Sequence, residues 1–223
     1  MAAMKKSGSQ AALWLLGGVL LVAGLAVGEP GEQPRGVSSS WQLEFAFEDP
    51  QRISVKLSGD GEETTYWYML YVVTNKTGTD VRFFPSFDLV TDTLQVIEGG
   101  ANVHPAVYDA IAARHKKDYP FFAPPWKVTG PLLQGTDNAR TSAVVFTTFD
   151  PLANRFTVYA SGLSGELKRV QNPGFDPAQP ESDQNPRFFI LRRTLGITYE
   201  LPGDPETRKG AQPVRRTREW VMR

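Results

Sequence analysis

The residues most able to do chemistry in this chain are two histidines, one serine in a glycine-rich turn and several groups of carboxylates. His104 and His115 lie about three helical turns apart, so one face of a helix could present both side chains. Zinc usually needs three or four ligands, and the sequence has neither an HxH nor an HExxH spacing. We therefore interpret His104 as a helix-end residue and His115 as a surface or half-buried residue, and we predict no metal site.

The candidate nucleophile is Ser164, in the segment Gly162-Leu163-Ser164-Gly165. This segment lacks the G-x-S-x-G spacing of a nucleophile elbow, and it follows a predicted strand without opening a clear helix. A catalytic triad would need Ser164, a histidine and an acid to converge. We interpret the segment as a turn after a strand. The chain has no cysteine, which excludes a thiol nucleophile and a disulfide framework.

Acidic residues gather in two loops, residues 59–63 and 176–183. Loops rich in oxygen ligands can hold Ca²⁺, but neither loop matches the D-x-[DN]-x-[DN]-G pattern. Solvated turns are the simpler interpretation. A glycosidase would use a pair of carboxylates, and no pair stands out in the sequence. We therefore predict no catalytic residue and no cofactor.

The most unusual segment, residues 119–126, combines four aromatic residues with three prolines. Proline restricts the backbone, so this segment should be stiff and extended. Aromatic rings contribute binding energy at low entropic cost, which favours a recognition surface for a sugar or a partner chain. The alternative is a crossing loop whose rings cover the open end of the fold. The candidate ligand-binding residues here are Tyr119, Phe121, Phe122 and Trp126.

The C-terminal residues 215–223 are basic and alternate like a strand. Arg216, Arg218 and Trp220 share one face, and they form a second candidate surface that could bind anionic lipid, polysaccharide or nucleic acid. Arginines on such a strand also protect an exposed sheet edge from pairing with another chain. The chain has 24 basic and 24 acidic residues, so it lacks the overall positive charge of a nucleic-acid-binding protein. We expect no nucleic-acid partner.

Alternation of apolar and polar residues, typical of half-buried strands, begins at Trp41. Residues 64–74 are mostly β-branched or aromatic on both faces, which predicts a central strand covered on each side. We predict an all-β antiparallel immunoglobulin-like sandwich of about seven to nine strands. The last expected strand pairs join residues 141–149 to 156–160 and residues 188–201 to 214–222.

One short inserted helix is predicted near residues 105–117. Pro105 suits the first position of a helix, because its missing N–H would have no partner there. Steps of three and four residues then place one set of side chains on a single face. This set comprises Val107, Tyr108, Ile111, Ala112 and His115.

The segment Tyr-Val-Val-Thr-Asn-Lys-Thr-Gly-Thr-Asp-Val, residues 71–81, predicts a hairpin because asparagine and glycine tolerate positive φ. It resembles the V-x-N-x-T/S-G/D hairpin common in immunoglobulin-like bacterial extracellular modules. The resemblance implies the fold and no catalytic residues, because these modules share no activity. Asn75-Lys76-Thr77 also fits the N-glycosylation pattern, and turn geometry accounts for the same residues.

Residues 1–28 have the three parts of an export signal. Lys5 and Lys6 are positive, residues 11–27 are apolar, and Ala26-Val27-Gly28 supplies small residues before a cut at Glu29. The alternative is an uncleaved anchor, because the apolar run approaches the ~20 residues that span a bilayer. Both interpretations place the following domain outside the cytoplasm.

The sequence thus divides into a signal peptide or anchor (1–28), a flexible linker (29–40) and one domain (41–223). We expect an exported protein, periplasmic or extracellular, that acts as a non-enzymatic binding or structural module of the cell envelope. Its partner would be an unidentified envelope protein or a polysaccharide, and it would contact the membrane only through residues 11–27 if the leader is retained. The alternatives are a secreted hydrolase and a polysaccharide-binding module acting on glycans.

If the leader is cleaved, we expect the exported protein to begin at Glu29, because small residues occupy the positions that signal peptidase recognises. Intact-mass spectrometry of protein recovered from outside the cytoplasm checks this. A mass that begins at Met1 would show instead that residues 11–27 are retained as an anchor.

Overall fold

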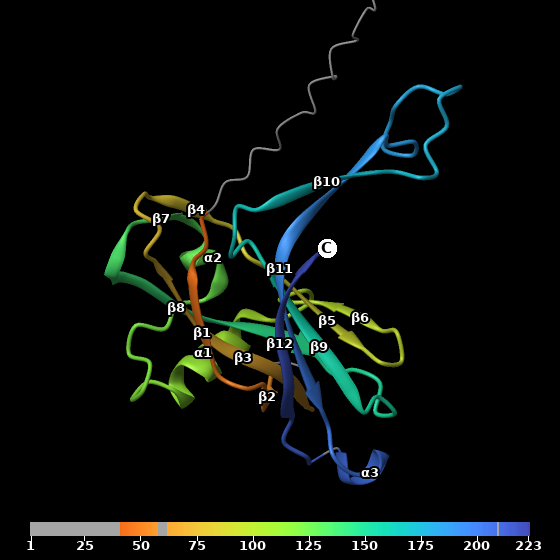
Figure 1. Cartoon of the computed structure of the whole chain (residues 1–223). Coiled ribbons are helices and arrows are strands. Elements are labelled where there is room, and N and C mark those ends of the chain that lie inside the picture. Colours follow the sequence, from red (N-terminus) through yellow and green to blue (C-terminus); the bar gives the residue numbers. More distant parts are fainter. Residues whose placement is uncertain (1–40, 58–61, 209) are drawn as a thin grey trace, which may run out of the picture. The chain divides into compact units, whose positions relative to one another are not determined.

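The computed structural model describes residues 41–57, 62–208 and 210–223 (Figure 1). The predicted leader 1–28 and linker 29–40 lie outside the described residues, as does part of the acidic loop 59–63. Among the described residues, antiparallel strands form two larger sheets and one small one, with three short helices. None of these helices is long and apolar enough to span a membrane.

The first sheet is built around β3, Glu63–Asn75. β2 pairs with the first half of this strand and β1 with the second half, while β8 pairs along its other edge. β3 is therefore the central strand of the sheet. The other strands of this sheet are β1 (Glu44–Phe47), β2 (Gln51–Lys56) and β8 (Gly135–Thr147).

The second sheet is built around β11, Phe188–Glu200. β9 and β10 pair with successive parts of one edge of β11, and β12 pairs with the other edge. β5 and β6 extend the sheet beyond β9. The other strands are β5 (Ser86–Thr91), β6 (Val96–Glu98), β9 (Arg155–Ser161), β10 (Leu167–Gln171) and β12 (Val214–Met222).

The remaining elements are short. β4, β7, α1 and α2 lie in the connections between the two sheets, and α3 lies between β11 and β12 of the second sheet. β4 and β7 pair only with each other among the described strands. Helix α1 begins at Pro105, as the sequence predicts, and ends at Arg114. The bounds are β4 (Val81–Phe83), β7 (Gly130–Leu132), α1 (Pro105–Arg114), α2 (Pro125–Val128) and α3 (Pro205–Arg208).

Alternate side chains of β3 enter two different hydrophobic cores. Trp67, Met69 and Tyr71 pack in the core between the two sheets. Tyr68 and Leu70 point the other way, into a core formed with helix α1. The molecule therefore has three layers, which are the second sheet, the first sheet and α1. The core between the sheets also contains Phe87, Leu89, Phe156, Val158, Leu195 and Ile197, and the core beneath α1 contains Val107, Tyr108, Ile111, Ala143 and Val145.

The all-β antiparallel sandwich predicted from the sequence is confirmed, with twelve strands among the described residues where about seven to nine were expected. The central strand at residues 64–74, the helix from Pro105 and the pairing of residues 188–201 with 214–222 are also confirmed. The unexpected strands include β7 and β10, which are too short to show a clear alternating pattern.

Two expected pairings are wrong. Residues 141–149 do not pair with 156–160, because β8 pairs with β3 and β9 pairs with β5 and β11. The connection 148–154 thus crosses from one sheet to the other. Nor do residues 71–81 form a hairpin, since β4 leaves β3 after the turn and pairs with β7. In both cases the segment pairs with a strand that is distant in the sequence and not with the strand next to it.

The side chain of Asn75 fixes the turn between β3 and β4. Its Nδ2 donates to the carbonyl oxygens of Thr79 and Leu132, each at 2.9 Å. Its Oδ1 accepts from the backbone N–H and the hydroxyl of Thr77, at 3.0 and 2.8 Å. The residue is 0% exposed, so in the folded domain it serves the turn and offers no surface to a glycan.

We expect Asn75→Ala to lower the free energy of unfolding by about 1–3 kcal/mol, because it removes the side-chain donor to the buried Leu132 carbonyl and the acceptor for Thr77. Asn138→Ala is the matched control, since the exposed Asn138 amide donates a single bond to the Gln134 carbonyl. Urea denaturation measures both variants. Equal destabilisation of the two variants would contradict the role given to Asn75.

Candidate functional site

The aromatic segment 119–126 is divided between the core and the surface. Tyr119 is half-buried and donates from its hydroxyl to Glu48 Oε1 at 2.5 Å. Phe122 packs against the core beneath α1, whereas Phe121 is 87% exposed. Trp126 is 57% exposed. These four candidates therefore do not form one continuous surface.

Trp126 lies instead at a pocket of about 530 Å³, which we call the Trp126 pocket. Five separate parts of the chain form its walls, so no stretch of sequence contains the site. Its lining includes Tyr71 of β3, Phe87 of β5, Glu98 of β6, Tyr108 of α1 and Trp126 of α2. Of these, only Trp126 was a candidate from the sequence.

The prolines of the segment place Trp126 at this pocket. Pro124 is the N-cap of α2 and Pro125 its first residue, where a missing N–H has no cost. The single turn closes when Lys127 donates from its N–H to the Pro124 carbonyl at 2.9 Å. Upstream, the N–H of Ala123 donates to the Thr141 carbonyl at 3.0 Å, which ties the segment to β8. The segment is therefore not extended throughout, contrary to the prediction from the sequence, because it ends in the helical turn that positions Trp126.

The rings at the pocket are perpendicular to each other. The centroids of Tyr108 and Trp126 lie 5.2 Å apart, and their planes meet at 82°. An edge-to-face pair of this kind is a favoured aromatic geometry. The two rings form a corner. A corner can contact a compact ligand on two sides, whereas a flat pair of rings could contact it on one side only.

Two glycines shape the pocket wall after β6. A Cβ on Gly99 would come within 2.4 Å of Val144 Cγ2, so only glycine lets the chain approach β8 this closely. Gly100 has φ +82° and donates from its N–H to the Val145 carbonyl at 2.7 Å. The sequence signal that could have pointed here is the glycine pair directly after a short strand.

The pocket is weakly acidic and contains buried hydroxyl groups. Among the described residues that line it, Glu98 is the only charged one. Burial raises the pKa of Tyr71 and that of Tyr108 to about 12, so both are neutral phenols at ordinary pH. The Ser142 hydroxyl, opposite Tyr71 in register, interacts with the buried Tyr71 hydroxyl and lowers its pKa, against the larger effect of burial. Tyr71 therefore contributes its ring to the pocket wall, while its hydroxyl is buried beside Ser142.

The histidines occupy opposite ends of α1. His104 caps the helix, because its Nδ1 accepts from the Ala106 N–H at 3.2 Å. His115 follows the last turn, and its Nε2 lies 2.7 Å from the hydroxyl of buried Tyr68. Neither residue lines the Trp126 pocket. Among the described residues, no group of three or more metal-ligating side chains comes together.

His115 belongs to a polar network that fastens α1 to β2 and β3. The Tyr68 hydroxyl donates to Gln51 Oε1 at 3.0 Å and accepts from Arg114 Nη1 at 3.3 Å. Gln51 Nε2 in turn donates to Glu48 Oε2 at 2.9 Å, and Glu48 also accepts from Tyr119. Each member of this network therefore has a hydrogen-bond partner, which favours a structural role for the network.

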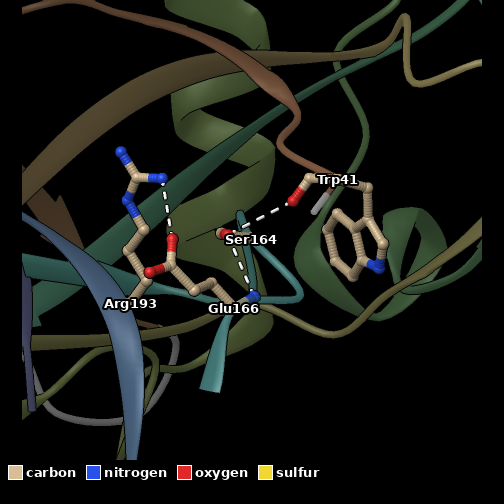
Figure 2. A network of polar contacts seen from close by, with 4 residues as sticks. All are labelled: Trp41, Ser164, Glu166 and Arg193. Atoms are coloured by element: carbon tan, nitrogen blue, oxygen red, sulfur yellow. Dashed lines mark hydrogen bonds and ion pairs between the residues drawn. The ribbon is translucent and has the colours of Figure 1, made fainter. Parts of the chain in front are cut away.

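Ser164 joins the start of the domain to the turn before β10 (Figure 2). Its Oγ donates to the Trp41 carbonyl and accepts from the Glu166 N–H, both at 3.2 Å. The carboxylate of Glu166 pairs with Arg193 Nη1 at 2.9 Å. The interpretation of this segment as a turn is consistent with these contacts, since no histidine is among the partners of Ser164.

The C-terminal candidates lie along the edge of the second sheet. Arg216 pairs with Glu200 at 2.8 Å, and the Arg218 guanidinium lies 5.4 Å from the ring centre of Phe47. Trp220 is half-buried against the core between the sheets. Within the described chain β12 pairs only with β11, so this strand is the edge that its arginines were expected to protect. None of these three candidates lines the Trp126 pocket.

Comparison with known proteins identifies no relative of this chain. No protein-family model matches the chain, and no curated protein or solved structure is significantly similar to it.

The tyrosine environments predict a loss of stability in alkali. Tyr71, Tyr108 and Tyr119 each have a pKa of about 12, the last mainly through its hydrogen bond to Glu48. In the unfolded chain they would ionise near 10. The unfolded state thus loses protons first, and we expect the free energy of unfolding to fall as pH rises from about 10 to 12.

Ultraviolet absorbance of phenolate, followed with urea denaturation at each pH, measures this effect. Tyr119→Phe should remove one late-ionising group and leave the others. Ionisation of every tyrosine near pH 10 in the folded protein would contradict the environments described.

Proposed function

We propose that this chain is an exported, non-enzymatic binding module of the cell envelope, of the immunoglobulin-like kind, and that the Trp126 pocket holds its ligand. The ligand we propose is a neutral sugar unit of a glycan. Export rests on the pattern of residues 1–28, and the immunoglobulin-like kinship rests on the antiparallel sandwich. The observation that carries the proposal is the pocket itself.

The size and chemistry of the pocket support a small ligand. Ligand pockets typically measure about 300–1,000 Å³ and combine apolar walls with a few polar groups. Here Phe87, Tyr108 and Trp126 give the apolar wall, and Glu98 gives a charged polar group. A sugar ring offers the matching surfaces, because its C–H face can lie against an aromatic ring while its hydroxyls fill hydrogen bonds.

The charge of the pocket favours a neutral ligand over an anionic one. Glu98 would repel a carboxylate or a sulfate, and the described lining offers no basic group to offset it. As an acceptor, the Glu98 carboxylate suits a hydroxyl donor, and hydrogen bonds to a charged group are the stronger kind.

A secreted hydrolase has less support from the same residues. Hydrolysis of a glycosidic bond usually needs two carboxyl groups on either side of the bond, about 5–10 Å apart. Glu98 is the only carboxylate in the described lining, and the contacts of Ser164, His104 and His115 lie in caps, turns and the network below α1. We therefore favour binding over catalysis.

We expect Trp126→Ala to weaken glycan binding about tenfold or more, because a central aromatic side chain commonly dominates a binding site. Phe121→Ala is the matched control, since this exposed ring belongs to the same segment but does not line the pocket. A glycan array identifies the ligand, and calorimetry then compares the variants. Failure of the protein to bind any glycan, or an equal loss in both variants, would contradict the proposal.

A further inference from the structure

A second pocket of about 280 Å³ lies where β2, β3, the connection after β8 and helix α3 meet. It shares no lining residue with the Trp126 pocket. Two arginines line it, one from β2 and one from α3, and we call it the Arg52–Arg208 pocket. Its lining includes Arg52, Thr65, Trp67, Thr148, Phe149 and Arg208.

The guanidinium of Arg52 has no acidic partner within the part of the chain that the structure describes. Its carbon lies 4.1 Å from the ring centre of Trp67, and its Nη2 donates to the carbonyl of Arg208 at 2.7 Å. Burial lowers the pKa of Arg52, which reflects the cost of removing an unpaired cation from water. An anion nearby would offset that cost.

Arg208 is held in the same way, by backbone carbonyls alone. Its Nε donates to the Gly203 carbonyl at 2.7 Å, and its Nη1 donates to the Leu152 carbonyl at 2.9 Å. A guanidinium has five N–H donors, so both arginines retain donors beyond those used here. The carbonyl bonds fix the two side chains in place. The exposed Asp204 carboxylate, whose pKa is lowered by hydrogen bonds from Thr207 and also by Arg208, offsets part of the charge of Arg208 only.

The rest of the lining is apolar or neutral, apart from one carboxylate. The rings of Trp67 and Phe149 stack with centroids 5.7 Å apart and planes 16° apart, which gives a flat wall. Asp150 also lines the pocket, and its Oδ1 accepts from the Leu152 N–H at 2.9 Å. Because two arginines face one aspartate, the charge of the described lining remains positive.

We infer that the Arg52–Arg208 pocket binds a small organic oxyanion, in which a carboxylate or phosphate is attached to an apolar body. Guanidinium groups bind both oxyanions through parallel hydrogen bonds, and these charge-assisted bonds are stronger than neutral ones. The stacked rings match the apolar body, and the threonine hydroxyls can donate to a remaining oxygen. This site is independent of the glycan site proposed above.

The test is an NMR titration of the full chain that follows the Nε–Hε signals of arginine. Benzoate and phenyl phosphate are the probes, and benzyl alcohol is the uncharged control. We expect both Arg52 and Arg208 signals to shift with at least one anion, and the affinity to fall as salt rises. Tighter binding of benzoate would identify a carboxylate ligand, and tighter binding of phenyl phosphate would identify a phosphate ligand.

Arg52→Gln and Arg208→Gln should each weaken binding about tenfold or more, because each removes one guanidinium group that can donate two parallel hydrogen bonds to the anion. Arg208→Lys keeps the positive charge but cannot donate two parallel hydrogen bonds, so we expect a smaller loss of affinity. This variant tests the inference if Arg52→Gln does not fold. Arg82→Gln, an exposed arginine outside the pocket, is the matched control. No anion-specific shift, or an equal effect of Arg82→Gln, would overturn the inference.

Discussion

The burial of both faces of β3 is the constraint on which the rest of the structure depends. A strand with large apolar side chains on each face needs a packed layer on each side, because each fully buried side chain contributes about 1.5–3 kcal/mol. The second sheet covers Trp67, Met69 and Tyr71, and helix α1 covers Tyr68 and Leu70. The same row of side chains also positions the pockets. Met69, in the middle of the row, is fully covered, while its neighbours Trp67 and Tyr71 each line a pocket.

The two pockets therefore share a strand and differ in charge. The lining near Tyr71 carries one carboxylate, and the lining near Trp67 carries two arginines and one aspartate. A neutral ligand and an anionic ligand would thus be separated by charge as well as by place. In both pockets one part of the aromatic wall comes from a sheet, and helices or connections supply the rest, such as Tyr108 and Trp126 in one pocket and Phe149 in the other. Such connections can vary without disturbing the core, which is how one sandwich can serve different ligands.

Much of the fold follows from local pattern, and the errors all concern distant pairing. The two-sided pattern of residues 64–74 and the proline at the start of α1 were sufficient to predict those elements. Nothing near residues 141–149 indicates that they pair with a strand some 75 positions earlier, because register depends on three-dimensional packing. Asn75 shows the same limit. Its pattern indicates a turn, yet the bond to Leu132 that directs the chain toward β7 comes from a distant residue.

The candidate sites were less predictable for the same reason. Trp126 stood out because aromatic residues and prolines are concentrated around it. Tyr71 and Tyr108 appeared in the sequence only as strand and helix residues, and Arg52 as one polar residue of an alternating strand. These residues reach their pockets from separate elements of the fold, and a single sequence does not indicate which elements come together.

The two ends of strand β11 differ in how they are paired. Residues 195–200 of β11 are paired on both sides, by β9 and β12, and their apolar side chains enter the core. Residues 188–191 pair only with β10 among the described strands (Figure 1). Phe189 and Ile190 are exposed. A two-stranded ribbon is marginally stable alone. Its amides should therefore exchange with solvent through local opening, while those a few residues along the same strand exchange only when the whole sandwich unfolds.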